Sequence, residues 1–235
     1  YIYSSILPQG LLKYFDIGKD ENLKEINVVT IATFQIYFKF EYYNNFTKIQ
    51  NLILDRQKAT YLTFGTFLYV SKTYNGLLIR CIWGLDPAAF VDDTARAIST
   101  AFIIGKLTEH YKVQIGIGIT TGACYIGLIK IQRKRKQLVI LGRKVNSSRA
   151  LSDKAVEKVL KINNKYLILC DKLTMQQSQK WYRHIYIAKI RIVLNQESDL
   201  CYEIIDLLNN ESIKLQHKGS NVKNNFIRND INFKK

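Results

Sequence analysis

The order of hydrophobic patterns along the sequence predicts an α+β fold. Its core would be the ferredoxin-like βαββαβ arrangement, extended by an extra hairpin, a helix and further strands. Three observations support this prediction. A strand pattern precedes a helical one, an Asn-Gly pair lies between two strand-like runs, and a second helical pattern leads into a glycine-rich strand. Strand, helix, hairpin, helix and strand is the order of the ferredoxin-like core.

Side-chain periodicity predicts the first half of this core. Residues 26–34, INVVTIATF, are β-branched and aromatic, as in a buried strand. Apolar residues then recur between Phe46 and Ile53 at the spacing of one helix face. Two strand-like runs flank Asn75-Gly76, which is a strong signal for a two-residue hairpin turn.

A second helix and a central strand complete the expected core. The stretch 92–111 opens with two aspartates that are candidate N-caps, and its apolar residues lie on one helix face. Residues 113–122, VQIGIGITTG, alternate with period two, as a strand does. The charge-free run 113–129 contains four glycines and is slightly short for a membrane span. We therefore expect a soluble protein without a membrane span.

The remaining patterns predict the additions to the core and the domain boundaries. In chain order these are a hairpin with a basic tip (123–142), a helix (144–161) and a strand (165–170). A capped helix start (171–179) and a final strand pair (186–194 and 200–207) follow. We expect residues 1–25 to be an amphipathic lead-in segment and residues 26–206 to be the folded domain. The lysine- and asparagine-rich residues 207–235 would be a basic polar tail or linker.

The cysteines do not form a metal-binding pattern. Cys81, Cys124, Cys170 and Cys201 are more than thirty residues apart, and the three histidines are not at ligand spacing. A zinc site is therefore not expected. Buried thiols in a reducing compartment are the expected state.

The chain carries a formal net charge of +16, and residues 125–161 hold eleven Lys or Arg against Asp153 and Glu157. A run of this kind is either a solvated surface loop or a contact for an anionic partner. Nucleic acid is a weak candidate for that partner, because no motif supplies the sheet-face aromatics of an RNA-recognition module.

One glycine pattern resembles a known family. IGIGITTGACYIG, followed after the basic loop by VILGRKVNSSR, resembles the nucleotide cyclase homology domain of class III adenylyl and guanylyl cyclases. In that family a glycine-bearing strand, here with Gly118, Gly122 and Gly127, precedes a glycine, a Val-Asn pair and an Arg. The stretches LPQGLL, VVTIATF and LCYEII follow in the family's order, so the resemblance covers residues 5–206. The chain looks most like the second, metal-free half of the soluble, bicarbonate-responsive adenylyl cyclases.

The resemblance implies an active site shared between two homologous halves. One half holds two metal ions through two aspartates, and the other supplies ribose, base and phosphate contacts. The two metal positions fall on Gln35 and Leu77 here. Neither side chain can bind magnesium as a carboxylate does. We expect no metal or other cofactor on this half alone, Mg²⁺ or Mn²⁺ on the partner half, and an inert homodimer.

The resemblance also implies roles for residues of the motif itself. Asn146 would orient the ribose, and Arg149 would stabilise charge on the α-phosphate. The family spaces these two residues by four positions, whereas here they are three apart and Ala150 stands in the fourth place. On a helix this turns the Arg by about 100°. Equally, the motif could be a helix start with Asn and Ser capping and a solvent-facing Arg.

Further nucleotide contacts are implied at scattered positions. Asn75 and Ile140 occupy the base-contacting positions, although Asn75 is explained better as the hairpin turn residue. Gly142 would let the backbone approach the nucleotide, and Lys189 lies near the position of a triphosphate-binding Lys. Arg135 matches a basic residue of the hairpin and could equally be surface charge.

Three functions are therefore compared. The chain would be the metal-free half of a two-half adenylyl cyclase converting ATP to cyclic AMP. Its partner would be a homologous metal-bearing half in the same longer chain or in another subunit. Alternatively, it would be an inactive cyclase-like domain, a pseudoenzyme serving as a dimerisation or scaffold module. A basic nucleic-acid binder is the weakest of the three. Analogy with the soluble cyclases implies an intracellular, cytoplasmic location, with a ciliary assembly as a further expectation.

Overall fold

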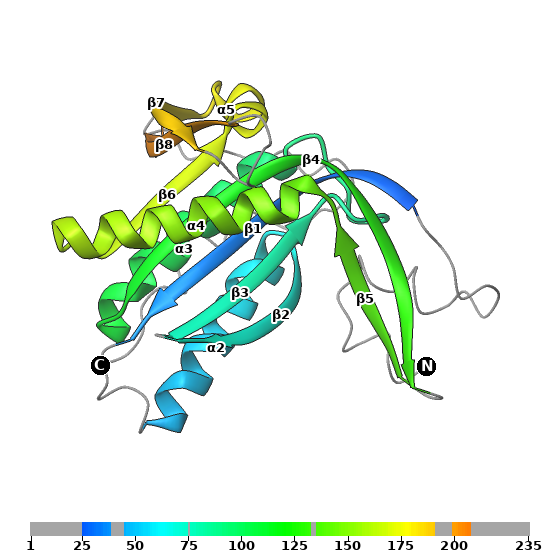
Figure 1. Ribbon diagram of the computed structural model, residues 1–235, viewed down its shortest axis with the longest axis horizontal. Helices are drawn as coiled ribbons and strands as arrows, with labels where there is room; N and C mark the ends of the chain where they lie inside the picture. Colours follow the sequence, from blue (N-terminus) through cyan, green and yellow to red (C-terminus); the bar gives the residue numbers. More distant parts are fainter. Residues whose placement is uncertain (1–24, 39–44, 75, 133–134, 191–198, 208–235) are drawn as a thin grey trace, which may run out of the picture.

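The computed structural model describes residues 25–38, 45–74, 76–132, 135–190 and 199–207 (Figure 1). Most of the expected lead-in and tail, residues 1–24 and 208–235, lies outside this description. The elements are β1 (Glu25–Tyr37), α2 (Phe46–Leu62), β2 (Thr66–Thr73), β3 (Gly76–Trp83), α3 (Asp93–Tyr111), β4 (Gln114–Gln132), β5 (Arg135–Leu141), α4 (Arg143–Ile162), β6 (Tyr166–Asp171), α5 (Lys172–Ser178), β7 (Tyr182–Ile190) and β8 (Asp199–Leu207). Their order confirms the predicted α+β class.

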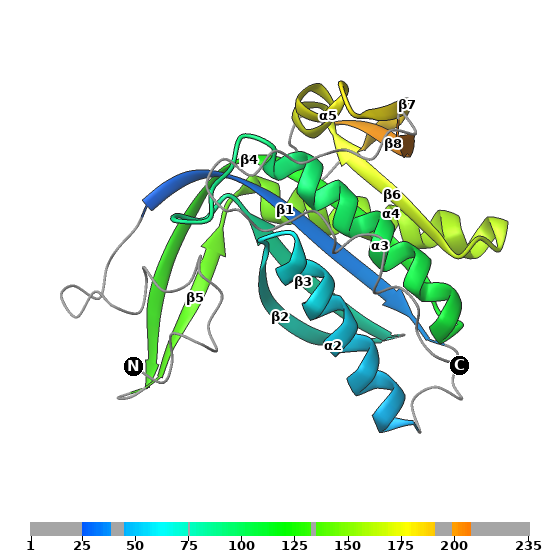
Figure 2. The same cartoon turned by 180° about the vertical axis from the view of Figure 1, so that it is seen from behind.

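The strands form one sheet in the order β2-β3-β1-β4-β6-β8-β7, with β5 paired to β4. The first four strands have the order of a ferredoxin-like core, because β1 and β3 are central and antiparallel. The pair β4–β6 is parallel, and α4 provides the crossover between them. Helices α2 and α3 cover one face of the sheet and α4 crosses the other (Figures 1 and 2).

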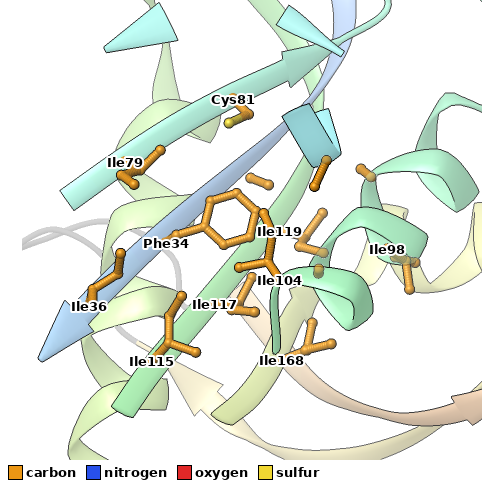
Figure 3. Packing of buried hydrophobic residues seen from close by; sticks show 14 of the residues in the cluster. Phe34, Ile36, Ile79, Cys81, Ile98, Ile104, Ile115, Ile117, Ile119 and Ile168 are labelled. Atoms are coloured by element: carbon orange, nitrogen blue, oxygen red, sulfur yellow. The ribbon is translucent and has the colours of Figure 1, made fainter. Parts of the chain in front are cut away.

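The main hydrophobic core lies between the sheet and helices α2 and α3. Alternate β1 residues, including Phe34 and Ile36, point into it and meet Ile98 and Ile104 of α3 (Figure 3). The glycine-rich β4 contributes Ile115, Ile117 and Ile119 to the same core, all completely buried. The period-two pattern of these strands therefore has a direct cause, since every second side chain is an apolar one facing α2 and α3.

The opposite face of β4 explains its glycines. A Cβ added at Gly116 would lie 2.2 Å from the Val156 nitrogen, and one at Gly118 would lie 2.2 Å from the Ser148 carbonyl oxygen. Helix α4 therefore rests directly on the backbone of β4. The helix side of this seam is equally small, because Ser148 and Ser152 are completely buried there.

Two details differ from the sequence-based expectations. Residues 113–122 and 123–131 were expected as separate strands, but β4 runs unbroken from Gln114 to Gln132. Its second half forms an arm with β5 that projects beyond the rest of the sheet (Figure 1). A strand can continue through Gly122, because glycine accepts its φ of 157°.

The two aspartates at the start of α3 were expected to cap the helix with their side chains, and this expectation is wrong. Asp92 occupies the N-cap position but makes no capping hydrogen bond. Its Oδ1 accepts a hydrogen bond from Arg96 Nε at 2.8 Å instead. Asp93 Oδ2 accepts from the backbone nitrogen of Phe90, which precedes the helix. Asp93 therefore holds the loop before α3, and Asp92 holds the buried side chain of Arg96.

All four cysteines are buried and unpaired, as expected. Burial raises the pKa of the Cys81 and Cys201 thiols to about 12 and that of Cys124 to about 11. These thiols are protonated at neutral pH and are not reactive nucleophiles. No helix in the described ranges is long and apolar enough to cross a membrane.

Candidate functional site

The motif that resembles the cyclases lies at the start of α4, where the chain leaves β5. Gly142 is the N-cap residue, with φ of 154°, and it provides no side-chain cap. A Cβ at this position would lie 3.3 Å from Cys124 Sγ, so glycine lets β5 end close against β4. The first turn of α4 therefore begins without a capping side chain. Backbone N–H groups at such an end can bind an anion.

Two polar contacts fix this first turn against the sheet. Lys144 Nζ forms an ion pair of 2.5 Å with Oδ2 of Asp171, which is 2% exposed. The Thr120 hydroxyl donates to the Lys144 carbonyl oxygen at 2.8 Å. Asp171 also caps α5, because its Oδ1 accepts a hydrogen bond from the Thr174 nitrogen. The start of α4 is thereby fixed to β4 and to the junction of β6 with α5.

Asn146 and Arg149 both lie on the exposed side of α4, as residues three apart on a helix can. Arg149 Nε lies 3.1 Å and 3.0 Å from the two carboxylate oxygens of Asp153, one turn later. Both partners of this ion pair are about half exposed, at 45% and 50%. An exposed pair of this kind is weak. A ligand can therefore draw Arg149 away from Asp153 at little cost.

The two positions that the resemblance assigns to metal-binding aspartates lie on adjacent strands. Gln35 of β1 is opposite Leu78, and Leu77 of β3 is opposite Ile36. Gln35 Nε2 donates to the Thr73 hydroxyl at 3.1 Å, while its buried Oε1 has no partner. Within the described residues no group of His, Cys, Asp or Glu could hold a metal ion. An amide and an aliphatic side chain do not provide the one or two carboxylates through which proteins commonly bind Mg²⁺.

A buried arginine on the same face was missed by the sequence analysis. Arg80 of β3 is 8% exposed, and its Nε donates to the Thr33 hydroxyl at 3.3 Å. Thr33 in turn shares a 2.7 Å hydrogen bond with the hydroxyl of Ser148 on α4. The Arg80 guanidinium also lies 5.1 Å from the centre of the Tyr69 ring. The signal was present in the sequence, because Arg80 is the one charged residue in the run LLIRCIW.

The other proposed contacts are only partly described. Ile140 is half-buried and packs against the apolar cluster that includes Ile82 and Val145, so its side chain supports the start of α4. A base contact at Ile140 stays a prediction. Asn75 lies outside the described residues, although β2 and β3 form the expected hairpin around it. Lys189 lies on β7, the edge strand at the opposite end of the sheet from β2, and it pairs with Leu200 of β8.

Comparisons with known proteins rest on the fold. No protein-family model matches the sequence, and no curated protein is significantly similar to it. The adenylyl cyclase CyaB from P. aeruginosa matches with a TM-score of 0.63 at 17% identity, over 79% of this chain and 97% of that one. The chain therefore has the nucleotide cyclase fold.

Guanylyl cyclases share this fold with the chain. The guanylate cyclase domain of RhGC from Catenaria anguillulae, solved with GTP, matches with a TM-score of 0.61 at 15% identity, over 78% of this chain and 99% of that one. The dimeric guanylyl cyclase domain of the RhoGC fusion protein from Blastocladiella emersonii matches with a TM-score of 0.58 at 15% identity, over 78% and 99%. These matches confirm the cyclase-like architecture expected from the glycine motif.

Proposed function

We propose that this chain is the metal-free half of a two-half adenylyl cyclase. In this proposal α4 contributes Asn146 to the ribose and Arg149 to the α-phosphate of ATP, which becomes cyclic AMP. Gln35 and Leu77 leave this half without metal ligands, so the partner half would hold Mg²⁺ or Mn²⁺. Those ions would activate the ribose 3′-hydroxyl and neutralise the triphosphate.

The observation that carries the proposal is the exposed, fixed start of α4 in a cyclase fold. Lys144 and Ser148 tie this turn to Asp171 and Thr33, while Asn146 and Arg149 remain on its open side. Donors held in place before the reaction stabilise developing charge without further reorganisation. The uncapped N-terminus of α4 adds its dipole to the same side.

A second candidate function has its own supporting observation. Arg149 is three residues from Asn146 and pairs with Asp153 on its own helix. An arginine used in this way is a surface residue of a helix, and the domain would then serve as a dimerisation or scaffold module. The partner in both cases is a homologous cyclase half. The intracellular, cytoplasmic and ciliary placement follows only from analogy with the soluble cyclases.

Reconstitution with a metal-bearing half tests the first function. The chain alone should form no cyclic nucleotide with Mn²⁺ and ATP or GTP. Mixed with a purified metal-bearing half of a soluble adenylyl cyclase, it should form cyclic AMP, measured by chromatography. Arg149→Ala should then lower kcat about 100-fold or more, the loss typical of one transition-state donor. Arg143→Ala, a change at the same helix start, should have a milder effect.

The two candidate functions are separated by Arg149→Ala together with a second variant, Asp153→Ala. It removes the helix partner of Arg149 and leaves the arginine in place. In an active pair, turnover should stay unchanged or rise. Should Arg149→Ala leave turnover intact, the arginine has no catalytic role and the scaffold function is the better one. Cyclic nucleotide formation by the homogeneous chain would contradict the assignment of the metals to the partner.

A further inference from the structure

The α4 face of the sheet holds a buried cation that the proposed cyclase chemistry does not use. Thr33 and Arg80 are opposite each other on β1 and β3. They face α4, because the neighbouring β1 residues Ala32 and Phe34 belong to the core under α2 and α3. The hydrogen bond from Thr33 to Ser148 connects this pair directly to α4.

Arg80 has no carboxylate partner within the described chain. Its Nε bonds Thr33 and its guanidinium lies beside Tyr69, but its two terminal NH₂ groups make no hydrogen bond there. A guanidinium offers five N–H donors in a fork that fits a phosphate or a carboxylate. A buried charge without a counter-ion destabilises the fold, and arginines in protein interiors are normally paired.

A second positive charge is carried by the helix that contacts this pair, because Arg149 directly follows Ser148 on α4 and the Ser148 hydroxyl shares a hydrogen bond with Thr33. Burial is the main cause of a lowered pKa of Arg80; the nearby Tyr69 hydroxyl raises this pKa, and the positive charge of Arg149 lowers it. Arginine remains protonated at neutral pH even so. Two guanidinium groups that repel each other on one face are stabilised when an anion lies between them.

A third group on this face also lacks a partner. The buried Gln35 Oε1 makes no hydrogen bond, and Gln35 is two residues after Thr33 on the same side of β1. A turn of the amide by 180° would let its oxygen accept from the Thr73 hydroxyl and direct its NH₂ group to an incoming anion. In that orientation the Gln35 NH₂ group lacks an acceptor, which an oxyanion would supply.

We propose that Arg80, oriented by the Thr33 hydroxyl, and Arg149 form a binding site for a phosphate group that requires no divalent metal. The phosphate belongs to inorganic phosphate or pyrophosphate, or to the polyphosphate of a nucleotide. A phosphate dianion matches two guanidinium groups in charge and accepts several hydrogen bonds at once. Arg149 and Tyr69 are exposed, so the site is reached from their side. Binding by the chain alone does not depend on cyclase activity.

Calorimetry and thermal unfolding of the 235-residue chain test this site. With EDTA present, inorganic pyrophosphate should bind and raise Tm by several degrees at saturation, relative to chloride at equal ionic strength. Arg80→Met should weaken binding by about tenfold or more. Its Tm without anion should equal or exceed that of the wild type. Arg183→Met, on the exposed edge strand β7, should change neither quantity.

Further variants test the site even if Arg80→Met does not fold, and further ligands identify what the site binds. Arg149→Met should weaken pyrophosphate binding several-fold, and Arg80→Lys should retain part of it, so the site can be tested even when Arg80→Met does not fold. If ATP binds more tightly than pyrophosphate and adenosine shows no binding, the site is assigned to a nucleotide. Equal affinities assign it to free phosphates. Absence of any pyrophosphate effect, or full binding by a folded Arg80→Met chain, would overturn the proposal, whatever the cyclase assay gives.

Discussion

Two buried arginines of this fold have opposite surroundings. Arg96 at the start of α3 is 1% exposed, and its guanidinium lies 4.2 Å from the Phe90 ring centre and 5.4 Å from that of Phe64. Its Nε bonds the Asp92 carboxylate at 2.8 Å. Arg80 is nearly as buried, but it has a hydroxyl in place of a carboxylate and a second arginine nearby.

Arg96 has the surroundings of a structural residue, whereas Arg80 has those of a residue that binds an anion. Arg96 is neutralised by its own helix and stacked between rings, so it stabilises the loop between β3 and α3 without any other molecule. Arg80 lacks the negative charge that would complete the same arrangement. A fold retains such a group at a cost in stability, which is a common property of binding sites.

Identical substitutions at the two arginines should give the largest contrast. Arg96→Met removes the ion pair and the stacking and leaves Asp92 without its partner, so we expect a loss of about 3 kcal/mol in unfolding free energy. Arg80→Met should be neutral or stabilising in a buffer free of phosphate. Denaturant titration of both variants measures the difference. Equal losses at both sites would show that Arg80 is a structural residue too.

The acid next to Arg96 should give the protein a pH-dependent stability. Burial is the largest cause that raises the pKa of Asp93, to about 6, and the Phe90 N–H and Arg96 oppose it. An acid whose pKa is raised in the folded state favours the fold below its unfolded pKa. This contribution disappears as the pH rises through 6. Asp93 should therefore lower the stability on going from pH 4 to 7.5, by on the order of 2 kcal/mol.

The variant Asp93→Asn isolates that contribution. An amide oxygen can still accept from the Phe90 nitrogen, but it does not titrate in this range. The difference in unfolding free energy between variant and wild type should shift in favour of the variant as the pH rises from 4 to 7.5. A difference that stays constant with pH would mean that Asp93 is charged in the fold throughout.

Most elements were predictable because their signal is local. The glycine-rich β4 and the helix after Gly142 follow from period and turn chemistry, and both are present. The continuity of β4 was missed, because the stretch Thr120–Gly122 within it has the composition of a turn. Arg80 was missed for another reason. A lone charge in an apolar strand shows its partners only after β1, β3 and α4 come together in the fold.

The smallest expected effect concerns the hydroxyl that joins the two parts of the proposed phosphate site. Thr33→Val keeps the shape of the side chain but removes the hydrogen bond to Arg80 Nε and the contact with Ser148. We expect a loss of about 1 kcal/mol in stability, the usual effect of one buried hydrogen bond. Pyrophosphate affinity should fall a few-fold, since the guanidinium loses its fixed orientation.

Ser148→Ala is the matched control, because Arg80 keeps its bond to Thr33 and the affinity should hardly change. Equal affinities in the wild type and Thr33→Val would mean that Arg80 binds the anion without help from Thr33, and the site would reduce to its two arginines.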